Sequence, residues 1–181
     1  EGIVPHVQRL DDQPTGAAFI YVNDTTGENA IIVVPGAAAG ITPADVEAAA
    51  EAIRSAAVFV TQLEQPVDAA MRGVEIARVA GVTTIFNPAP AEPVPDAIYP
   101  LCDYVTPNES EAALLTGVTV RSIEEAREAA EVFLAKGVGT ALITLGENGA
   151  LLHNRDTSVH VPAFRAGAVV ETAGAGDALA A

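Results

Sequence analysis

The chain has 181 residues, half of them hydrophobic, and its 9 Lys and Arg against 24 Asp and Glu give a formal charge of −15. Nucleic acids and anionic membrane surfaces are poor partners for such a chain, because affinity for both depends on basic residues. The single cysteine, Cys102, excludes an internal disulfide and a multi-cysteine zinc site. The N-terminus lacks a basic segment followed by an apolar run, which favours a cytoplasmic protein.

The first predicted elements form a β-hairpin. Two apolar runs, 17–22 and 30–34, are joined by a polar segment that contains glycine, which is the pattern of two paired antiparallel strands. The segment 7–10 is a candidate for a third strand. We therefore expect an antiparallel β flap at the N-terminal end of the chain.

Helices and strands alternate after residue 36. We expect helices at 43–54, 66–80, 109–116 and 122–136, and strands at 58–60, 82–86, 104–105, 140–145, 150–152, 158–161 and 168–170. Ser122 with Glu125 three residues later has the pattern of a capping box, and Lys136 in the last turn of the same helix favours the negative end of the helix dipole. Strands separated by helices of this length predict a parallel α/β sheet with right-handed crossovers.

A glycine turn near the C-terminus has features of an anion site. The segment 169–179 is a strand, the turn Gly174-Ala175-Gly176 and the start of a helix, so consecutive backbone N–H groups face one space. A dinucleotide fingerprint fails here, because its sixth position is Leu179 instead of glycine. Asp177 fits a general base that takes a proton from a hydroxyl while the N–H groups hold a phosphoryl group. The alternative is that Asp177 only caps the helix.

Two common lysine-dependent phosphate sites are absent from the sequence. The only lysine, Lys136, follows Ala135 and precedes Gly137, which does not match a Walker loop. It also ends a predicted helix, whereas a protein kinase needs its lysine on a strand. Phosphoryl transfer by this chain therefore requires a metal ion and backbone N–H groups, or residues outside the chain.

Four segments in order resemble the ribokinase branch of the PfkB carbohydrate kinases. They are NPAPA at 87–91, TPNESE at 106–111, TLGENG at 144–149 and GAGD at 174–177. The resemblance covers essentially the whole chain. It implies a ribokinase-like three-layer α/β/α sandwich with a small antiparallel β lid, in which residues 1–36 are the lid segment. Residues 37–181 would be the nucleotide-binding half of the α/β core, truncated at both ends of the family fold.

The resemblance also implies an activity, the phosphorylation of a sugar hydroxyl by ATP and Mg²⁺, with ribose as the expected sugar. Asp177 would be the catalytic base that also touches the sugar, and Gly174, Ala175 and Gly176 would form the anion hole. Other PfkB substrates, namely fructose, a nucleoside or a modified sugar, stay open. So does a non-catalytic piece that binds nucleotide or dimerises.

The resemblance places nucleotide-binding residues on two further segments. Asn108 and Glu111 would lie at the ATP phosphates, with Glu111 ordering Mg²⁺ through water, as suits a cation that keeps several waters. Thr144 and Gly146, at the end of a strand, would face the same phosphates, which is where ligands bind in open α/β sheets. Without the resemblance, Glu111 is explained as part of a favourable acidic first turn of a helix.

Sugar and cation contacts complete the expectations. Glu64 matches a sugar-contacting residue, although an ordinary loop charge is the alternative, and Ile32 with Ala17 points towards a hydrophobic cover. In ribokinases such a lid closes over the sugar and pairs with a second subunit, so we expect a homodimer. Glu171 and Thr172 match a loop for a monovalent cation, K⁺, but aspartate is usual in place of Glu171. Cys102 lacks a matched basic partner and is expected to be inert packing.

Overall fold

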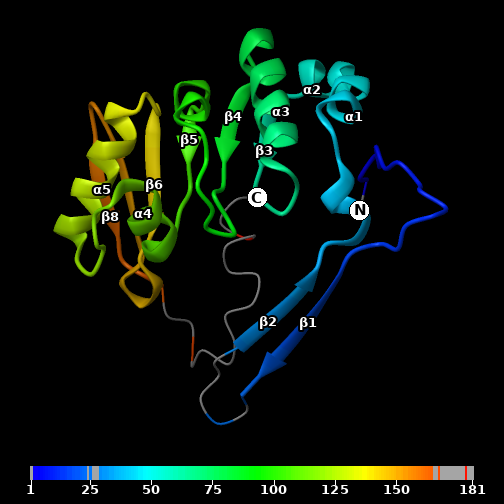
Figure 1. Ribbon diagram of the computed structural model, residues 1–181. Coiled ribbons are helices and arrows are strands. Elements are labelled where there is room, and N and C mark those ends of the chain that lie inside the picture. Colours follow the sequence, from blue (N-terminus) through cyan, green and yellow to red (C-terminus); the bar gives the residue numbers. More distant parts are fainter. Residues whose placement is uncertain (1, 24, 26–28, 165–166, 168–177, 179–181) are drawn as a thin grey trace.

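The computed structural model describes residues 2–23, 25, 29–164, 167 and 178, and it contains two separate sheets (Figure 1). The smaller is the predicted hairpin, in which β1 (Ala17–Val22) and β2 (Asn29–Val34) pair antiparallel. We call this hairpin the lid. The candidate third strand at 7–10 does not form: this segment has no regular secondary structure and belongs to neither sheet.

The larger sheet has six strands that lie side by side in chain order. They are β3 (Val58–Thr61), β4 (Thr83–Phe86), β5 (Tyr104–Val105), β6 (Thr140–Thr144), β7 (Ala150–Asn154) and β8 (Ser158–Val161). Strands β3 to β6 are parallel as expected, but β7 and β8 are antiparallel to their neighbours. The parallel arrangement expected for strands separated by helices is thus found for β3 to β6, whereas the connection from β6 to β7 is too short for a parallel crossover.

Five α-helices and three short 3₁₀ helices connect the described strands. The α-helices are α1 (Pro43–Ala48), α2 (Ala50–Ser55), α3 (Val67–Ala80), α4 (Glu109–Thr116) and α5 (Ile123–Ala135). The 3₁₀ helices are η1 (Gly36–Gly40), η2 (Asp96–Leu101) and η3 (Gly146–Asn148). The helix predicted at 43–54 is thus two helices with a break at Ala49.

Capping groups explain where several helices begin and end. The α3 and α4 helices end at Gly81 and Gly117, both with the positive φ that glycine adopts without strain. The capping box expected at α5 is only half formed: Ser122 Oγ accepts the Glu125 N–H, but the Glu125 carboxylate accepts the N–H of Arg121 instead. The cap is nevertheless sufficient, since the first-turn N–H of Glu125 has its partner.

Lys136 makes more contacts than an interaction with the helix dipole alone would require. Its Nζ lies 3.0 Å from Asp96 Oδ1, 3.2 Å from the Leu115 carbonyl and 4.7 Å from the ring centre of Tyr99. These contacts join α5, α4 and η2. The only lysine of the chain is therefore a structural residue.

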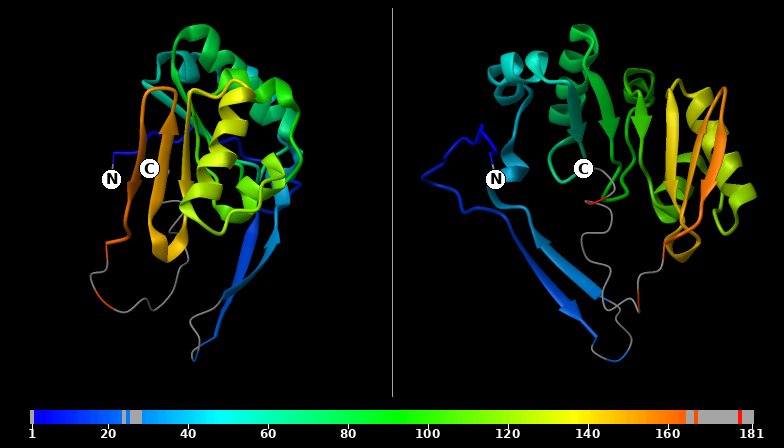
Figure 2. Two further views of the ribbon diagram at one scale, coloured as in Figure 1. Left: turned by 90° about the vertical axis from the view of Figure 1, so that its left-hand side faces the viewer. Right: turned by 180° about the vertical axis from the view of Figure 1, so that it is seen from behind.

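One face of the larger sheet carries the core. Helices α3, α4 and α5 pack on this face (Figure 2). Alternate strand residues such as Phe86, Val105 and Ile143 are fully buried beneath them. Residues in the intervening positions, among them Val58, Val60, Tyr104, Val159 and Val161, are exposed on the other face. In the described ranges, no helix combines the length and the apolar character needed to cross a membrane.

Candidate functional site

The carboxyl ends of the parallel strands are joined to one another by backbone hydrogen bonds. Three bonds of 2.9 to 3.0 Å each join the last residue of a strand to the loop that follows the neighbouring strand. The N–H of Asn87 donates to the Thr61 carbonyl, that of Thr106 to Phe86, and that of Thr144 to Pro107. A fourth bond of 2.8 Å joins Leu63 N–H to the Ala89 carbonyl. The loops that hold the predicted site residues of the core therefore form one continuous edge, on the side where the lid lies (Figure 1).

Asn108 and Glu111 form a complete capping box at the start of α4. Asn108 Oδ1 accepts the Glu111 N–H at 2.8 Å, and the two Glu111 oxygens accept the Asn108 N–H at 2.8 Å and the Asn108 Nδ2–H at 2.9 Å. Reciprocal bonds of this kind satisfy N–H groups that a helix start leaves unpaired. The structural explanation of Glu111 is thus confirmed, and any role at the phosphates is additional to it.

The Glu111 side chain is also unusually enclosed for a carboxylate, since the residue is 8% exposed. Burial raises the pKa of the Glu111 carboxyl above its ordinary value of 4.5, and the hydrogen bond from the Asn108 backbone offsets only part of that rise. A buried carboxylate with a raised pKa is stabilised by a cation close by, so this group fits the vicinity of Mg²⁺. The described residues contain no group of three acidic, His or Cys side chains able to hold a metal.

The loop after β6 brings the other predicted nucleotide residues to the same place. Thr144 is tied to Pro107, next to Asn108, by the backbone bond described above. Gly146 has φ +52, and a Cβ on it would lie 3.6 Å from Glu109 Oε1. Asn108, Glu111, Thr144 and Gly146, which are up to 38 positions apart in the sequence, therefore belong to one structural unit.

Glu64 lies on the loop after β3, away from that unit. The residue is exposed, and its N–H donates to Gln62 Oε1 at 2.6 Å. Gln65 holds the same loop through Nε2, which donates to Thr61 Oγ1 at 2.9 Å. Gln62 and Gln65 line a cavity of about 930 Å³ between β3 and the N-terminal segment. The Glu64 carboxylate is thus presented at the strand ends by a well-bonded turn.

The lid presents apolar side chains on both of its faces. Ile32 lies opposite Phe19 in the pairing, and Ala17 is two residues from Phe19, so all three share one face. Ile32 is 68% exposed and Phe19 is 65% exposed. Ile32 and Ala17 therefore lie on the same face of the lid, and their role as a cover over the sugar stays a prediction. The opposite face carries Ile20 and Ile31, which lie directly across from each other.

The last predicted site residues lie outside the described residues. They are the base Asp177, the anion-hole residues Gly174, Ala175 and Gly176, and the cation-site residues Glu171 and Thr172. The strand expected at 168–170 lies outside them as well. All of these stay predictions.

Other residues at this edge escaped the sequence patterns. The Thr106 hydroxyl is buried and has no hydrogen-bond partner in the described part of the chain, although it lies two residues before Asn108. His160 Nε2 is 2.6 Å from the Asn148 carbonyl oxygen, which connects β8 to η3. A histidine in an alternating strand pattern gives no sign of its partner, so only the structure reveals this contact. Cys102, as expected, is buried, and burial raises the pKa of its thiol to about 12.

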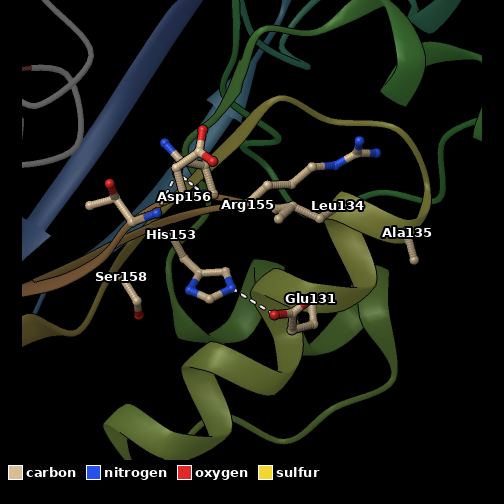
Figure 3. Close-up of a pocket in the computed structure, with 9 residues that line it drawn as sticks. Glu131, Leu134, Ala135, His153, Arg155, Asp156 and Ser158 are labelled. Carbon is tan, nitrogen blue, oxygen red and sulfur yellow. Dashed lines mark hydrogen bonds and ion pairs between the residues drawn. The ribbon is translucent and has the colours of Figure 1, made fainter.

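A second cavity, of about 550 Å³, lies beside the turn that joins β7 to β8. His153 Nε2 lies 3.0 Å from Glu131 Oε1, and Figure 3 shows this pair together with Asp156, which is on the turn between β7 and β8. Asn154 of this group pairs with Thr140, the first residue of β6, in the sheet register. The cavity therefore lies at the amino end of β6, remote from the strand ends that carry the candidate site.

Comparison with known proteins identifies the family of the chain. The model of the "pfkB family carbohydrate kinase" matches residues 1–181. A ribokinase of Staphylococcus aureus (strain COL) is 41% identical over 172 residues, and a deoxyribokinase of Salmonella typhi is 38% identical over 174. The alignments cover 95% and 96% of this chain but 56% of each relative, so the chain spans about half the length of these relatives.

A solved structure agrees with the sequence comparison. The structure of Arabidopsis thaliana ribokinase complexed with ribose and ATP superposes with a TM-score of 0.78 at 28% identity, over 93% of this chain and 57% of that one. The ribokinase-like α/β class with a small antiparallel sheet, expected from the sequence, is confirmed. The chain belongs to the pfkB family of carbohydrate kinases.

Proposed function

We propose that the chain is part of an ATP-dependent sugar kinase that phosphorylates ribose to ribose 5-phosphate. The observation that carries the proposal is the bond from Thr144 N–H to the Pro107 carbonyl, which joins the two predicted nucleotide segments at the carboxyl edge of the sheet. Ligands of open α/β sheets bind at this edge. The ribokinase and deoxyribokinase names of the relatives support the same substrate class.

The nucleotide phosphates are proposed to lie between the start of α4 and the loop after β6. The N-terminus of a helix carries partial positive charge that favours phosphate. Asn108 holds the Glu111 carboxylate in place, and Glu111 orders a water of Mg²⁺. Mg²⁺, when bound, would neutralise negative charge on the phosphates. Thr144 and Gly146 contact the phosphate oxygens from the neighbouring loop.

The chemical step is proposed to be an in-line displacement. Asp177 accepts the proton of the sugar's primary hydroxyl as the hydroxyl oxygen bonds to the γ-phosphorus, and the bond from that phosphorus to the ADP oxygen breaks. The N–H groups of Gly174, Ala175 and Gly176 stabilise the charge on the transferring group. Potassium bound near Glu171 and Thr172 is part of the proposal.

Substrate position is proposed to depend on Glu64 and the lid. The Glu64 carboxylate accepts hydrogen bonds from sugar hydroxyls, and the face of the lid that carries Ile32 closes over the sugar. Closure excludes water, which would otherwise compete for the phosphoryl group.

The relatives also favour a second sugar. A deoxyribokinase at 38% identity supports 2-deoxyribose almost as well as the ribokinase supports ribose. Fructose, a nucleoside or a modified sugar would be other members of the same reaction class. A non-catalytic piece that binds nucleotide is the alternative of a different kind, since the chain spans about half of the relatives' length.

A coupled ADP-release assay with ATP and Mg²⁺ tests the kinase. We expect ADP release with ribose to exceed that with 2-deoxyribose, fructose and a nucleoside. The assay is run on the 181-residue chain and on a version extended to the length of its relatives. Nucleotide binding by the short chain with turnover only in the longer one would make this chain a non-catalytic piece. No ADP release with any sugar in either version would contradict the proposed function.

We also propose that the lid pairs two copies of the chain through the face that carries Ile20 and Ile31, which are 52% and 50% exposed. Replacing Ile31 by lysine places a charge in that interface, so we expect light scattering to shift from dimer to monomer. Val79→Lys on α3 is the matched control, since Val79 is 90% exposed and distant from the lid in sequence and fold. A dimer that persists in Ile31→Lys would exclude this face.

A further inference from the structure

The loop after β6 is a closed turn whose shape depends on its own backbone. Asn148 N–H donates to the Leu145 carbonyl at 2.9 Å, Gly149 N–H to the Gly146 carbonyl at 3.1 Å, and Leu145 N–H to the Gly149 carbonyl at 2.8 Å. Gly146 and Gly149 have φ of +52 and +93, which glycine adopts without strain. These bonds fix the conformation of the turn. They do not fix its position relative to the rest of the edge.

Strand β8 is in direct contact with the back of this turn. A Cβ on Gly149 would lie 2.0 Å from the Val161 carbonyl oxygen and 2.7 Å from Ala163 N, so the two backbones touch. One residue earlier in β8, His160 Nε2 lies 2.6 Å from the Asn148 carbonyl oxygen. A carbonyl only accepts hydrogen bonds, so Nε2 carries a proton and donates it. The turn is thus held from behind by a side chain from a different strand.

We propose that His160 is a positioning residue of the nucleotide site. Its hydrogen bond to Asn148 sets the position of η3, and with it that of Gly146, relative to the start of α4. The His160 donor is already used by a protein carbonyl, so the residue acts through the turn and does not touch the nucleotide. The inference rests on the proposed function, because it needs the loop after β6 to contact phosphate.

The alternative is a bond that stabilises the fold alone, and the two roles predict different measurements. A positioning role changes nucleotide affinity without a matching change in sugar affinity or in kcat. A purely structural role lowers the unfolding temperature and leaves nucleotide affinity unchanged. The neighbouring strand β7 offers an internal comparison. Its His153 bonds Glu131 (Figure 3) and pairs with Ser158, the first residue of β8, at the end remote from the turn.

The test measures ATP affinity by titration calorimetry and turnover by ADP release, in the chain extended to the length of its relatives. His160→Leu removes the donor, and we expect ATP affinity to fall about fivefold, the effect of one ordinary hydrogen bond, with kcat and the KM for sugar within about twofold. His160→Gln places an amide N–H the same number of bonds from Cβ, and we expect it to restore affinity to within about twofold. His153→Leu is the matched control, and it should leave ATP affinity unchanged.

The outcomes separate this inference from the proposed function. The positioning role is overturned if His160→Leu leaves ATP affinity unchanged or if His160→Gln fails to restore it. Normal turnover in the parent chain would then leave the proposed kinase function intact. No turnover with any sugar, together with a His160-dependent ATP affinity, overturns the kinase and supports the positioning role. A parent chain that does not bind ATP overturns both.

Discussion

Replacing Asp177 by asparagine is expected to lower the kcat of sugar phosphorylation about a thousandfold. Asparagine has the size of aspartate but does not accept the proton of the sugar hydroxyl, and general base catalysis contributes on the order of 10²- to 10⁴-fold to such reactions. The affinities for ATP and sugar should change much less, because the shape of the site is kept. The measurement is the ADP-release assay at saturating ATP and sugar, with KM values determined for both.

Asp156→Asn provides the matched control for that substitution. It makes the same chemical change on the exposed turn between β7 and β8, at the end of these two strands that is remote from the candidate site. Turnover of Asp156→Asn should equal that of the parent chain. If Asp177→Asn retains turnover within a few-fold of the parent, Asp177 is not the base, and the helix-capping alternative explains the residue.

Local signals predicted much of the fold. The helix expected at 109–116 is α4 (Glu109–Thr116), and Gly117 ends it as glycine commonly does. The lid was equally clear, since two apolar runs around a polar turn leave few alternatives. These elements are decided by residues close in sequence, which is why a sequence pattern is sufficient to find them.

Strand direction and helix continuity were less accessible. Apolar runs do not say whether a buried strand is parallel or antiparallel. The direction of β7 follows instead from the short η3 connection, which leaves no room for a parallel crossover. The break at Ala49 falls in a run of alanines, all of which favour a helix. Both α1 and α2 pack on α3, and such tertiary contacts are not reported by local propensity.

The site shows the same division between local and distant contacts. The sequence explains Glu111 as part of an acidic first turn, and the family resemblance places it with Asn108 at the phosphates. Only the structure reveals their capping box and the burial of the Glu111 carboxylate. The contacts of Thr144 with Pro107 and of His160 with Asn148 join separate strands. Such contacts depend on the register of the sheet, so they follow from the fold and not from any motif.

Glu111→Gln is expected to separate the stability of the fold from its function. Because burial raises the pKa of Glu111 in the folded chain, the folded state binds a proton more tightly than the unfolded state. The stability contributed by this group is therefore fully present below its ordinary pKa of 4.5 and is lost as the pH rises through the folded pKa. Glutamine does not titrate. The unfolding free energy of the variant relative to the parent should therefore improve as the pH rises from about 4 to 7.

Activity should respond in the opposite sense at neutral pH. Glutamine lacks the charge that is proposed to order a water of Mg²⁺, and loss of such an indirect metal contact lowers affinity or rate about 10- to 100-fold. We expect kcat with MgATP to fall by that factor, or the Mg²⁺ concentration needed for half-maximal rate to rise by it. Urea unfolding across pH and ADP release across Mg²⁺ concentration measure the two effects.

An exposed carboxylate supplies the comparison for both measurements. Glu128→Gln on α5 makes the same change on the solvent side of a helix, and we expect neither the pH-dependent gain nor the loss of rate. A stability difference between Glu111→Gln and the parent that is constant across pH would contradict the burial effect. Full activity of Glu111→Gln would leave Glu111 as a capping residue alone. A variant that gains relative stability with pH while losing activity would show that this buried charge is kept at a cost to the fold, as expected of a functional group.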